Sequence, residues 1–368
     1  MIRSELLQDP GALEPYRDAW DSLADEAAEP YCASAWLLAW WHEAAPRRAR
    51  LRVAVATEAG RLLGVAPFYA DQRLRAVEWL KPLAASVSHR VQPLAARGRH
   101  AEVAAALAGA LARARPTPRL VSLEGIPRDS LWPQLLADSW PGRRPRIHHR
   151  GSGAAPELRL HGRDYAGWLA GQSPNFRQQV RRMRRRLEGR GARFRRVAAG
   201  DDLATAVRAL VTLHHARWAE RGGSAAVDPH VERMLLAAAE SMADAERLWL
   251  WAIEADGRIV SAYLFVRAGD RVAYWLGGHD DDWGACQPGM QALLAAVEDA
   301  FDRGLSTLDL GPGVQAYKGR LTNETVALDS ASLAVAGAAY PLARATLAAV
   351  DVRRAAMPRL RAARRRLR

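Results

Sequence analysis

The stretch RLWLWAIEADGRIVSAYLFVRAGDRVAYWLGG, residues 247–278, decides the fold class of this chain. It contains three runs of aliphatic and aromatic residues, which Asp256-Gly257 and Gly269-Asp270 separate. Pairs of glycine and aspartate favour the tight turns of β-hairpins because both residues tolerate positive φ angles. The stretch therefore predicts three consecutive antiparallel strands.

Helical and strand patterns around these strands complete one α+β unit. Ser173-Pro174 is typical of a helix start, with serine as the N-cap and proline in the first turn, and this helix is expected to end near Gly189. We expect the other elements of the second half to be a strand at 192–198, helices at 201–221 and 228–243, a helix at 290–303, and strands at 306–313 and 324–333.

The first half repeats this order of elements. We expect helices at 13–27 and from residue 34, strands at 51–57, 61–69 and 74–80, a helix at 101–114, a strand at 119–126, a helix at 130–140 and a strand at 146–150. The segments LRVAVATEAGRLLGVAPFY (51–69) and LWLWAIEADGRIVSAYLFV (248–266) both consist of an apolar run, a turn and a second apolar run. The match predicts an internal duplication, with two α+β units and mostly antiparallel sheets.

The chain is long enough for two such domains, at 368 residues. Residues 141–156 are rich in proline, glycine and arginine, a composition typical of a linker. We therefore expect an N-terminal domain at 1–155, a second domain at 156–335 and a basic C-terminal helix at 336–368.

The composition is that of a globular protein, with 49% hydrophobic and 25% charged residues, and it excludes a disordered or collagen-like chain. No apolar run is long enough to span a bilayer, and no basic and apolar signal segment opens the sequence. The two cysteines, Cys32 and Cys286, favour a reducing compartment. We expect a cytoplasmic protein.

The net charge of +13 comes from two short stretches. Residues 173–196 hold ten arginines and one glutamate, residues 353–368 hold eight arginines and no acid, and the rest of the chain carries −4. The arginines between Arg177 and Arg190 point in many directions along a helix, so we expect no single basic face. Aromatic residues for base stacking are not interleaved with them, which makes nucleic acid an unlikely partner. The basic tail is a candidate for peripheral contact with a membrane surface.

Several segments together resemble a known family. In the second half they are LHHARW (213–218), WAIEADGRIVSAYLFV (251–266), YWLGGHDDDWGACQPGMQALLAAVEDAFDRG (274–304) and LDLGPGVQAYKGRLTNE (308–324). In the first half, SAWLLAWW (34–41) and VAPFY (65–69) agree. The order of elements resembles the GNAT acyltransferase fold, and the details resemble the double-GNAT acetyltransferases of the cellulose-biosynthesis (CelD/BcsL) type, relatives of the FemAB peptidyltransferases. The resemblance implies two tandem GNAT-like domains.

The resemblance also implies a site for acetyl-CoA or another acyl-CoA between two splayed strands of the second half. The cofactor-binding candidates lie where a loop becomes a helix, and they are Gly284, Gln287, Pro288, Gly289 and Met290. Free N–H groups and the helix dipole at such a terminus suit a pyrophosphate, and the glycines permit close approach of the backbone. Gln287 stands where the family usually has serine.

The catalytic candidates follow from the same resemblance. Asp309 is expected to act as a base or to orient the acceptor amine, and Tyr317 to protonate the leaving thiolate. His214 matches the family better than its neighbour His215, which faces another direction on the helix. The substrate-binding candidates are Lys318, Asn323 and Tyr274, with Lys318 as a point charge for a phosphate or a carboxylate.

Other site chemistries are less well supported by the sequence. His279 precedes three consecutive aspartates, which lack the alternating spacing of a calcium loop, so we expect no metal. The stretch SHRVQP (88–93) replaces an acidic stretch common in the family, which predicts a different charge on the substrate.

We expect an acyl-CoA-dependent acyltransferase, with the acceptor in the cleft between the halves. The acceptor would be an amine or hydroxyl of a small molecule, a sugar or a cell-envelope precursor. Two alternatives remain: a FemAB-like aminoacyl-tRNA-dependent peptidyltransferase, which would use the arginine-rich helix, and a non-catalytic scaffold of a polysaccharide-synthesis complex.

Overall fold

Two hairpins of the same build lie in the two halves of the molecule. The computed structural model describes residues 1–71, 77–162, 164–198, 202–219, 223–224, 226–313, 315–337 and 340–366. Ala59 and Gly60 turn the first hairpin with φ angles of 49° and 81°, and Asp256 and Gly257 turn the second with 52° and 72°. Two successive positive φ angles match the twist of the flanking strands. Both predicted hairpins and the three strands within 247–278 are confirmed.

The elements of the two halves correspond one to one. The first half contains β1 (Arg3–Leu7), α1 (Arg17–Ala27), α2 (Ser34–Glu43), β2 (Arg50–Glu58), β3 (Arg61–Asp71), β4 (Trp79–Pro82), α3 (His100–Ala112), β6 (Leu120–Pro127), α4 (Trp132–Asp138) and β7 (Arg146–Arg159). The second half contains β8 (Arg193–Val197), α7 (Leu203–Ala219), α8 (Pro229–Ala243), β9 (Leu248–Ala255), β10 (Arg258–Ala268), β11 (Arg271–His279), α9 (Pro288–Asp302), β12 (Thr307–Asp309), α10 (Ala316–Leu321) and β13 (Glu324–Ala334). The predicted duplication is therefore visible in the order of elements.

The remaining elements lie between or beyond these repeats. They are the 3-10 helices η1 (Pro10–Tyr16), η2 (Pro30–Cys32) and η3 (Asp281–Cys286), the short strand β5 (Leu94–Ala95), and helices α5 (Tyr165–Ala170), α6 (Pro174–Gly189) and α11 (Tyr340–Arg366). The strand predicted at 74–80 falls partly on residues 72–76, which are outside the described residues; its described part begins β4.

The strands form one sheet in the order β1-β2-β3-β4-β6-β13-β7-β12-β11-β10-β9-β8, with β5 beside β3. Within each half, antiparallel strands lead to one parallel pair, β4 with β6 and β11 with β12. The predicted α+β class, two GNAT-like units with mostly antiparallel pairing and flanking helices, is confirmed.

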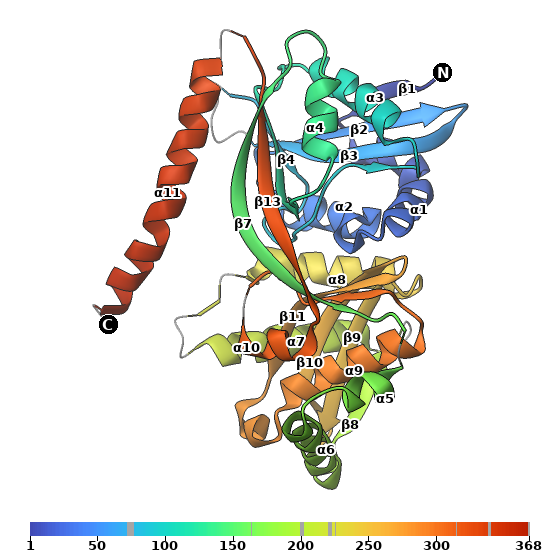
Figure 1. Cartoon of the computed structure of the whole chain (residues 1–368), viewed down its shortest axis with the longest axis vertical. Coiled ribbons are helices and arrows are strands. Elements are labelled where there is room, and N and C mark those ends of the chain that lie inside the picture. Colours follow the sequence, from blue (N-terminus) through green and yellow to red (C-terminus); the bar gives the residue numbers. More distant parts are fainter. Residues whose placement is uncertain are drawn as a thin grey trace.

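The two halves exchange their last strands. β7 follows β6 in the chain but pairs with β12, while β13 follows β12 but pairs with β6. The exchanged strands also pair antiparallel with each other, from Glu324 beside Glu157 to Ala334 beside Arg146. Figure 1 shows these long strands running together from one half to the other. The exchange joins the two repeats into a continuous sheet.

Strand β7 occupies most of the segment that the sequence suggested as a linker, so the linker prediction is wrong for residues 146–156. Gly151 and Gly153 lie at a register shift between β7 and β13, where an irregular backbone favours glycine. The predicted boundary between residues 155 and 156 falls inside this strand. How the chain divides into folding units stays a prediction.

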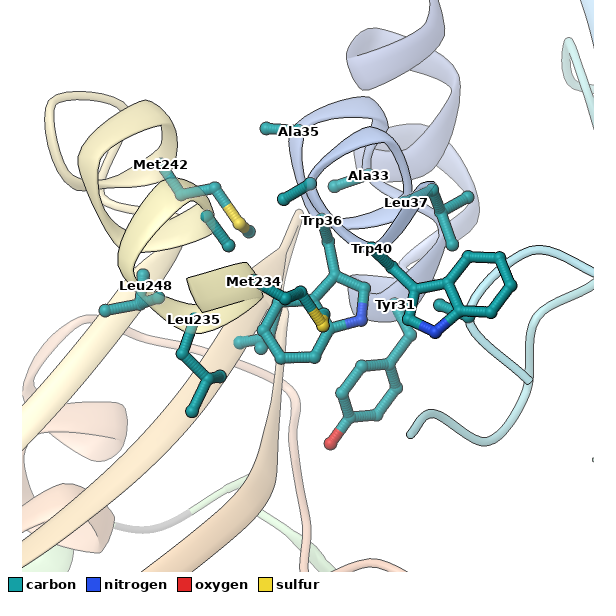
Figure 2. Close-up of a cluster of buried hydrophobic side chains, with 14 of the residues drawn as sticks. Tyr31, Ala33, Ala35, Trp36, Leu37, Trp40, Met234, Leu235, Met242 and Leu248 are labelled. Atoms are coloured by element: carbon teal, nitrogen blue, oxygen red, sulfur yellow. The ribbon is translucent and has the colours of Figure 1, made fainter. Parts of the chain in front are cut away.

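Helices from both halves share one hydrophobic core. Trp36 and Trp40 of α2 are fully buried in one cluster with Met234 and Leu235 of α8, and Met234 lies beside the ring of Trp36 (Figure 2). The same cluster continues to Leu248 and the strands of the second half. Burial of large side chains of this kind contributes ~1.5–3 kcal/mol each, so the interface between the repeats is a core rather than a contact of two surfaces.

Helix α6 has one apolar face and one basic surface. Phe176, Val180, Met183 and Leu187 are buried at spacings of four, three and four residues, which places them on one side. The arginines are spread over the rest of the helix surface, in agreement with the expectation that they point in many directions. The predicted cap is confirmed, because the Ser173 hydroxyl accepts the N–H of Phe176 at 3.3 Å.

The predicted C-terminal helix is present as α11, which begins at Tyr340 and extends away from the body of the molecule (Figure 1). Ala343 and Leu347 near its start are buried against a small cluster that includes Leu120. No helix in the described part of the chain has the length and apolarity that a membrane span requires.

Candidate functional site

Strands β11 and β12 diverge after a short parallel contact. They pair only over Arg271–Ala273 and Thr307–Asp309. Beyond Asp309 the chain follows β7 instead, with the N–H of Leu310 bonded to the carbonyl of Pro156 at 3.0 Å. Strand β11 continues beside β10 to His279. The divergence opens a wedge in the middle of the sheet.

A cavity of about 820 Å³ fills this wedge. Its wall comes from β11, the turn after β12, the start of α9, α7, α10 and the segment 86–89 of the first half. A volume of this size is in the range of small-molecule sites. It brings together eight of the predicted site residues: Tyr274, His214, Tyr317, Lys318, Gly284, Gln287, Gly289 and Met290. Pro288, Asp309 and Asn323 do not line it.

The start of α9 faces the cavity. Gln287 caps the helix in a left-handed conformation with a φ of 51°, and its side chain accepts the amide N–H of Gln179 from α6 at 2.8 Å. Pro288 follows in the first turn, so the next free N–H groups are those of Gly289 and Met290, which both line the cavity. This terminus can receive an anion from the cavity side.

The protein atoms around Gly289 leave no room for a side chain. A Cβ atom there would lie 2.2 Å from the hydroxyl oxygen of Tyr263 and 3.0 Å from Nδ1 of His279. Tyr263 is buried, which raises its pKa to about 12, and its ring stacks on Tyr274 at 5.7 Å. The tight packing holds the Tyr263 hydroxyl against the first turn of α9.

Arg217 from α7 brings a positive charge to the same region. Its guanidinium is 3.4 Å from Nδ1 of His279, and it lies close enough to lower the pKa values of Tyr263 and Tyr317 against the opposing effect of burial. Sequence analysis missed Arg217, although the quoted segment LHHARW contains it. Its position three residues after His214 places both on one side of the helix.

His214 is buried in the cavity wall and held by two contacts. Its Nδ1 lies 3.4 Å from the carbonyl of Gly277, and its Nε2 lies 2.8 Å from the hydroxyl of Ser224. A tautomer with hydrogen on Nδ1 satisfies both contacts and leaves Nε2 as the proton acceptor. Burial lowers the pKa of His214, which keeps the ring neutral. His215 is exposed, in agreement with the expectation that the two histidines face different ways.

Asp309 belongs to a buried ion-pair cluster between the halves. Its Oδ2 lies 3.1 Å from Nε of Arg90 and 3.9 Å from Arg271, and its Oδ1 accepts the N–H of Gly311 at 2.7 Å. Arg90 and Arg271 also both bond Glu157 of β7. The carboxylate of Asp309 is fully buried and already partnered. The geometry favours a positioning role, in which Asp309 shapes the turn that carries Gly311.

Lys318 from α10 is buried at the base of this turn, with 3% of its surface exposed. Its Nζ donates to the carbonyls of Gly311 and Pro312 at 3.0 and 2.9 Å. Burial lowers the pKa of Lys318 to about 8, and the nearby Asp309 opposes that shift. An ammonium group has three donors, and the third makes no hydrogen bond to the residues that the structure describes.

Tyr317 and Asn323 have different surroundings. Tyr317 lines the cavity, and burial raises its pKa, so the hydroxyl keeps its proton at neutral pH. Asn323 instead bonds the backbone of Arg159 on both sides of its amide, at 2.8 and 3.1 Å. This places Asn323 at the junction of β13 and β7.

The first half closes the cavity with the segment 86–89. Indole N–H groups of Trp36, Trp40 and Trp275 hold Ser88, Ser86 and the carbonyl of Val87 at 2.7 to 3.2 Å. The segment ends in His89, whose pKa burial lowers to about 4. His89 was not predicted as a site residue, since only the fold brings it to the second half.

The equivalent wedge of the first half is filled by the chain itself. There β4 and β6 pair only through two residues each. Beyond them, the N–H of Arg90 bonds the carbonyl of Gly125 at 3.0 Å, and Val91 bridges to Glu124. The segment that brings His89 to the wedge of the second half thus also fills the wedge of the first half.

The described residues contain no group of three histidine, cysteine or acidic side chains arranged to hold a metal ion. His279 contacts Arg217, and Asp280 caps η3 and pairs with Arg258 at 2.6 Å.

Comparison with known proteins agrees with this geometry. Residues 174–319 match the acetyltransferase (GNAT) domain. No curated protein sequence matches the chain. The whole chain is similar in structure to FemX, with a TM-score of 0.62 and 10% identity over 86% of this chain and 95% of that one.

Two further solved structures are similar over nearly their full lengths. L-PGS from Bacillus licheniformis gives a TM-score of 0.55 at 13% identity, over 92% of this chain and 97% of that chain. The C-terminal domain of a putative lysylphosphatidylglycerol synthetase from Agrobacterium fabrum gives 0.56 at 11%, over 92% and 96%. These identities indicate a shared fold alone. Residues 174–319 thus match the acetyltransferase (GNAT) domain, within a chain whose fold is similar to that of FemX.

Proposed function

We propose that the protein is an acyl-CoA-dependent acyltransferase of the double-GNAT (CelD/BcsL) type. It would transfer an acetyl or other acyl group to an amine or hydroxyl of a small molecule, a sugar or a cell-envelope precursor. One observation carries the proposal: the first turn of α9 opens into a cavity between two diverging strands. A helix terminus for the pyrophosphate next to a wedge for the pantetheine arm suits acyl-CoA.

The residues around α9 fit the phosphate end of this co-substrate. The N–H groups of Gly289 and Met290 face the cavity, and Arg217 adds a full positive charge beside them. Gln179 and Gln287 lie at the same end of the cavity and hold α6 to the start of α9. The apolar side chains of Leu293 and Leu310 and the ring of Tyr274 suit the uncharged arm.

We assign the proton transfers to two cavity residues. When the acceptor attacks the thioester carbonyl, its N–H or O–H proton passes to Nε2 of His214, directly or through Ser224. The carbon–sulfur bond then breaks, and Tyr317 donates its proton to the thiolate. The proton that His214 has taken up then passes to Tyr317, so that both residues return to their starting protonation states. Asp309 keeps the turn at Gly311 in place, and Lys318 binds a negatively charged group of the acceptor.

Calorimetric titration with acetyl-CoA tests the proposal. We expect saturable binding by the full chain that weakens little with salt. A chain with Gly189→Ala is the control and should bind equally, because Gly189 does not line the cavity and a Cβ there meets no atom within 4 Å. Absence of acetyl-CoA binding by the unmodified protein would contradict the proposal.

A second candidate, a FemAB-like aminoacyl-tRNA-dependent transferase, is favoured by the basic surface of α6. Arg181, Arg182, Arg185 and Arg186 are exposed there, while Gln179 of the same helix lines the cavity. Total tRNA titrated at two salt concentrations distinguishes the candidates, because each phosphate contact makes binding more sensitive to salt. Strong salt-dependent tRNA binding without acetyl-CoA binding would favour the second candidate. Binding of neither would favour a non-catalytic scaffold.

A further inference from the structure

The cavity wall carries an excess of positive charge. Arg217, Lys318 and Arg320 line it, and none of the described lining residues is an aspartate or a glutamate. Asp309, behind the turn, pairs with Arg90 and Arg271, and Asp280 pairs with Arg258. A small molecule in the cavity therefore meets cations without compensating carboxylates.

Lys318 is the most informative of these cations. Transfer of an ammonium group out of water is costly unless a counter-charge and hydrogen bonds compensate it. Its described hydrogen bonds go to two carbonyl oxygens, which satisfy donors but supply no net charge. Arg52 and Arg90, the other cations buried to this degree, each have a carboxylate within 3.2 Å. Lys318 has the environment of a cation that awaits an anionic ligand.

The neighbours of Lys318 keep this charge uncompensated. The carboxylate of Asp309 attracts the ammonium group of Lys318, but it is already paired with Arg90 and Arg271. His89 is neutral because burial lowers its pKa to about 4. Nε2 of His89 has no hydrogen-bond partner within the described ranges. His89 comes from the first half, so Lys318 lies where both halves contribute to the wall. Arg217 instead neighbours Tyr263 and His279 at the start of α9.

We infer that the acceptor is an anion, a molecule whose reactive hydroxyl or amine lies near a phosphate or a carboxylate group, and that Lys318 and the exposed Arg320 bind this group. The inference rests on the proposed function and assigns α10 to the acceptor, with Arg217 and α9 left to the donor. It disfavours polyamines, aminoglycosides and protein lysines, whose positive charge would find no carboxylate on the described wall.

Matched pairs of probes test the inference in calorimetric titrations of protein saturated with CoA. One pair is glucosamine 6-phosphate and glucosamine, and the other is alanine and alaninamide; inorganic phosphate and spermidine complete the set. Both members of each pair carry the amine, and only one of them carries the anionic group. We expect one of the anionic probes to bind about 10- to 100-fold more tightly than its partner, the range of a hydrogen bond to a charged group. The two pairs distinguish phosphate from carboxylate.

The variant Lys318→Met should lose this preference while its affinity for acetyl-CoA stays unchanged. Lys81→Met is the matched control, because Lys81 is the only other lysine and pairs with Asp71 at the far side of β3. Bound anion should also raise the pKa of Lys318 from about 8, so at pH 8 binding should take up protons. Heats measured in buffers of different ionisation enthalpy report this uptake, which Lys318→Met should abolish.

Three results would overturn the inference: tighter binding of glucosamine, alaninamide or spermidine than of the anions, no binding of any anionic probe, or unchanged anion binding by Lys318→Met. A loss of CoA affinity in Lys318→Met would assign the lysine to the donor and also overturn it. If acetyl-CoA does not bind, the proposed function fails separately, and the same titrations on the free protein still decide whether Lys318 forms an anion site.

Discussion

At the scale of single residues, three neighbouring candidates have different surroundings. His214 and Tyr317 line the cavity as neutral groups, whereas Asp309 is buried among arginines. Arg90, which pairs with Asp309, lies more than two hundred residues earlier in the chain, so the sequence could not indicate this ion pair. The resemblance alone therefore suggested Asp309 as a base or as a group that orients the acceptor amine.

We expect His214→Gln to lower turnover about 10²–10⁴-fold, the usual contribution of a general base. Glutamine keeps a hydrogen bond to Gly277 or Ser224 but cannot take up the proton. His215→Gln is the control, since that ring is exposed on the same helix. Release of CoA from acetyl-CoA, followed with a thiol reagent, measures the effect. Equal loss in both variants would exclude His214 as the base.

The pH profile gives an independent test of His214. Because burial lowers its pKa, the neutral form persists below the ordinary histidine value of about 6.5. Turnover should therefore stay level as pH falls through 6.5 and decline only at a lower pH, where His214 becomes protonated. In His214→Gln this acidic decline should disappear. A decline centred at 6.5 or above in the unmodified protein would point to another base.

Asp309→Asn should act mainly on stability. It removes the charge that faces Arg90 and Arg271, and disruption of a buried pair costs about 3–5 kcal/mol. Glu188→Gln is the control, because the exposed pair of Glu188 with Arg184 contributes only about 0.3–0.5 kcal/mol. Denaturant unfolding measures both. Normal stability together with lost turnover would restore Asp309 as a catalytic base.

Gly289 and Tyr263 allow a rescue experiment. Gly289→Ala should weaken acetyl-CoA binding, because the new methyl group would displace the Tyr263 hydroxyl and the first turn of α9. Adding Tyr263→Phe removes the clashing oxygen and should recover part of the affinity. If the affinity for acetyl-CoA does not recover, the methyl group blocks the ligand directly, as expected from the sequence.

At the scale of elements, residue types within short segments predicted the hairpin turns and the helix caps. The hairpin turns, the Ser173 cap and the Asp228 cap of α8 follow from residue types at fixed positions, and the structure contains all of them. The apolar spacing in α6 was present in the sequence but was masked by the number of arginines. The strand predicted at 146–150 is the start of β7, but its continuation to Arg159 could not be predicted, because its pairing depends on β12 and β13, which lie far along the chain.

The strand exchange predicts that neither half folds alone. We expect fragments 1–162 and 163–368 to be insoluble when expressed separately, since β7 and β13 would each lose a partner strand and α2 would expose Trp36 and Trp40. Co-expressed, they should purify together, because the cut after Gly162 leaves every strand intact. Co-purification and a cooperative thermal transition are the measurements. A stable, acetyl-CoA-binding 163–368 fragment would show independent domains.

At the scale of the whole molecule, positive charge gathers in three places with different surroundings. Lys318 is enclosed, the arginines of α6 belong to a helix whose Gln179 lines the cavity, and the second half of helix α11 has an arginine-rich sequence. The cavity can therefore bind its ligands without involving the tail. Because the described contacts of α11 with the body end at Asp351, which pairs with Arg150 at 3.2 Å, the residues from 353 onward can be tested separately.

We propose that the tail makes peripheral contact with anionic membranes, and its removal tests this. Each arginine near an anionic leaflet contributes about 1 kcal/mol, so eight arginines are sufficient for binding that salt screens. The full chain should sediment with vesicles of phosphatidylserine and phosphatidylcholine but not with phosphatidylcholine alone, and less in high salt. A chain ending at Val352 should lose this binding while its acetyl-CoA affinity and thermal transition stay unchanged, because the buried contacts of α11 remain. Equal vesicle binding by the shortened chain would indicate that the arginines of α6, and not those of the tail, bind the membrane.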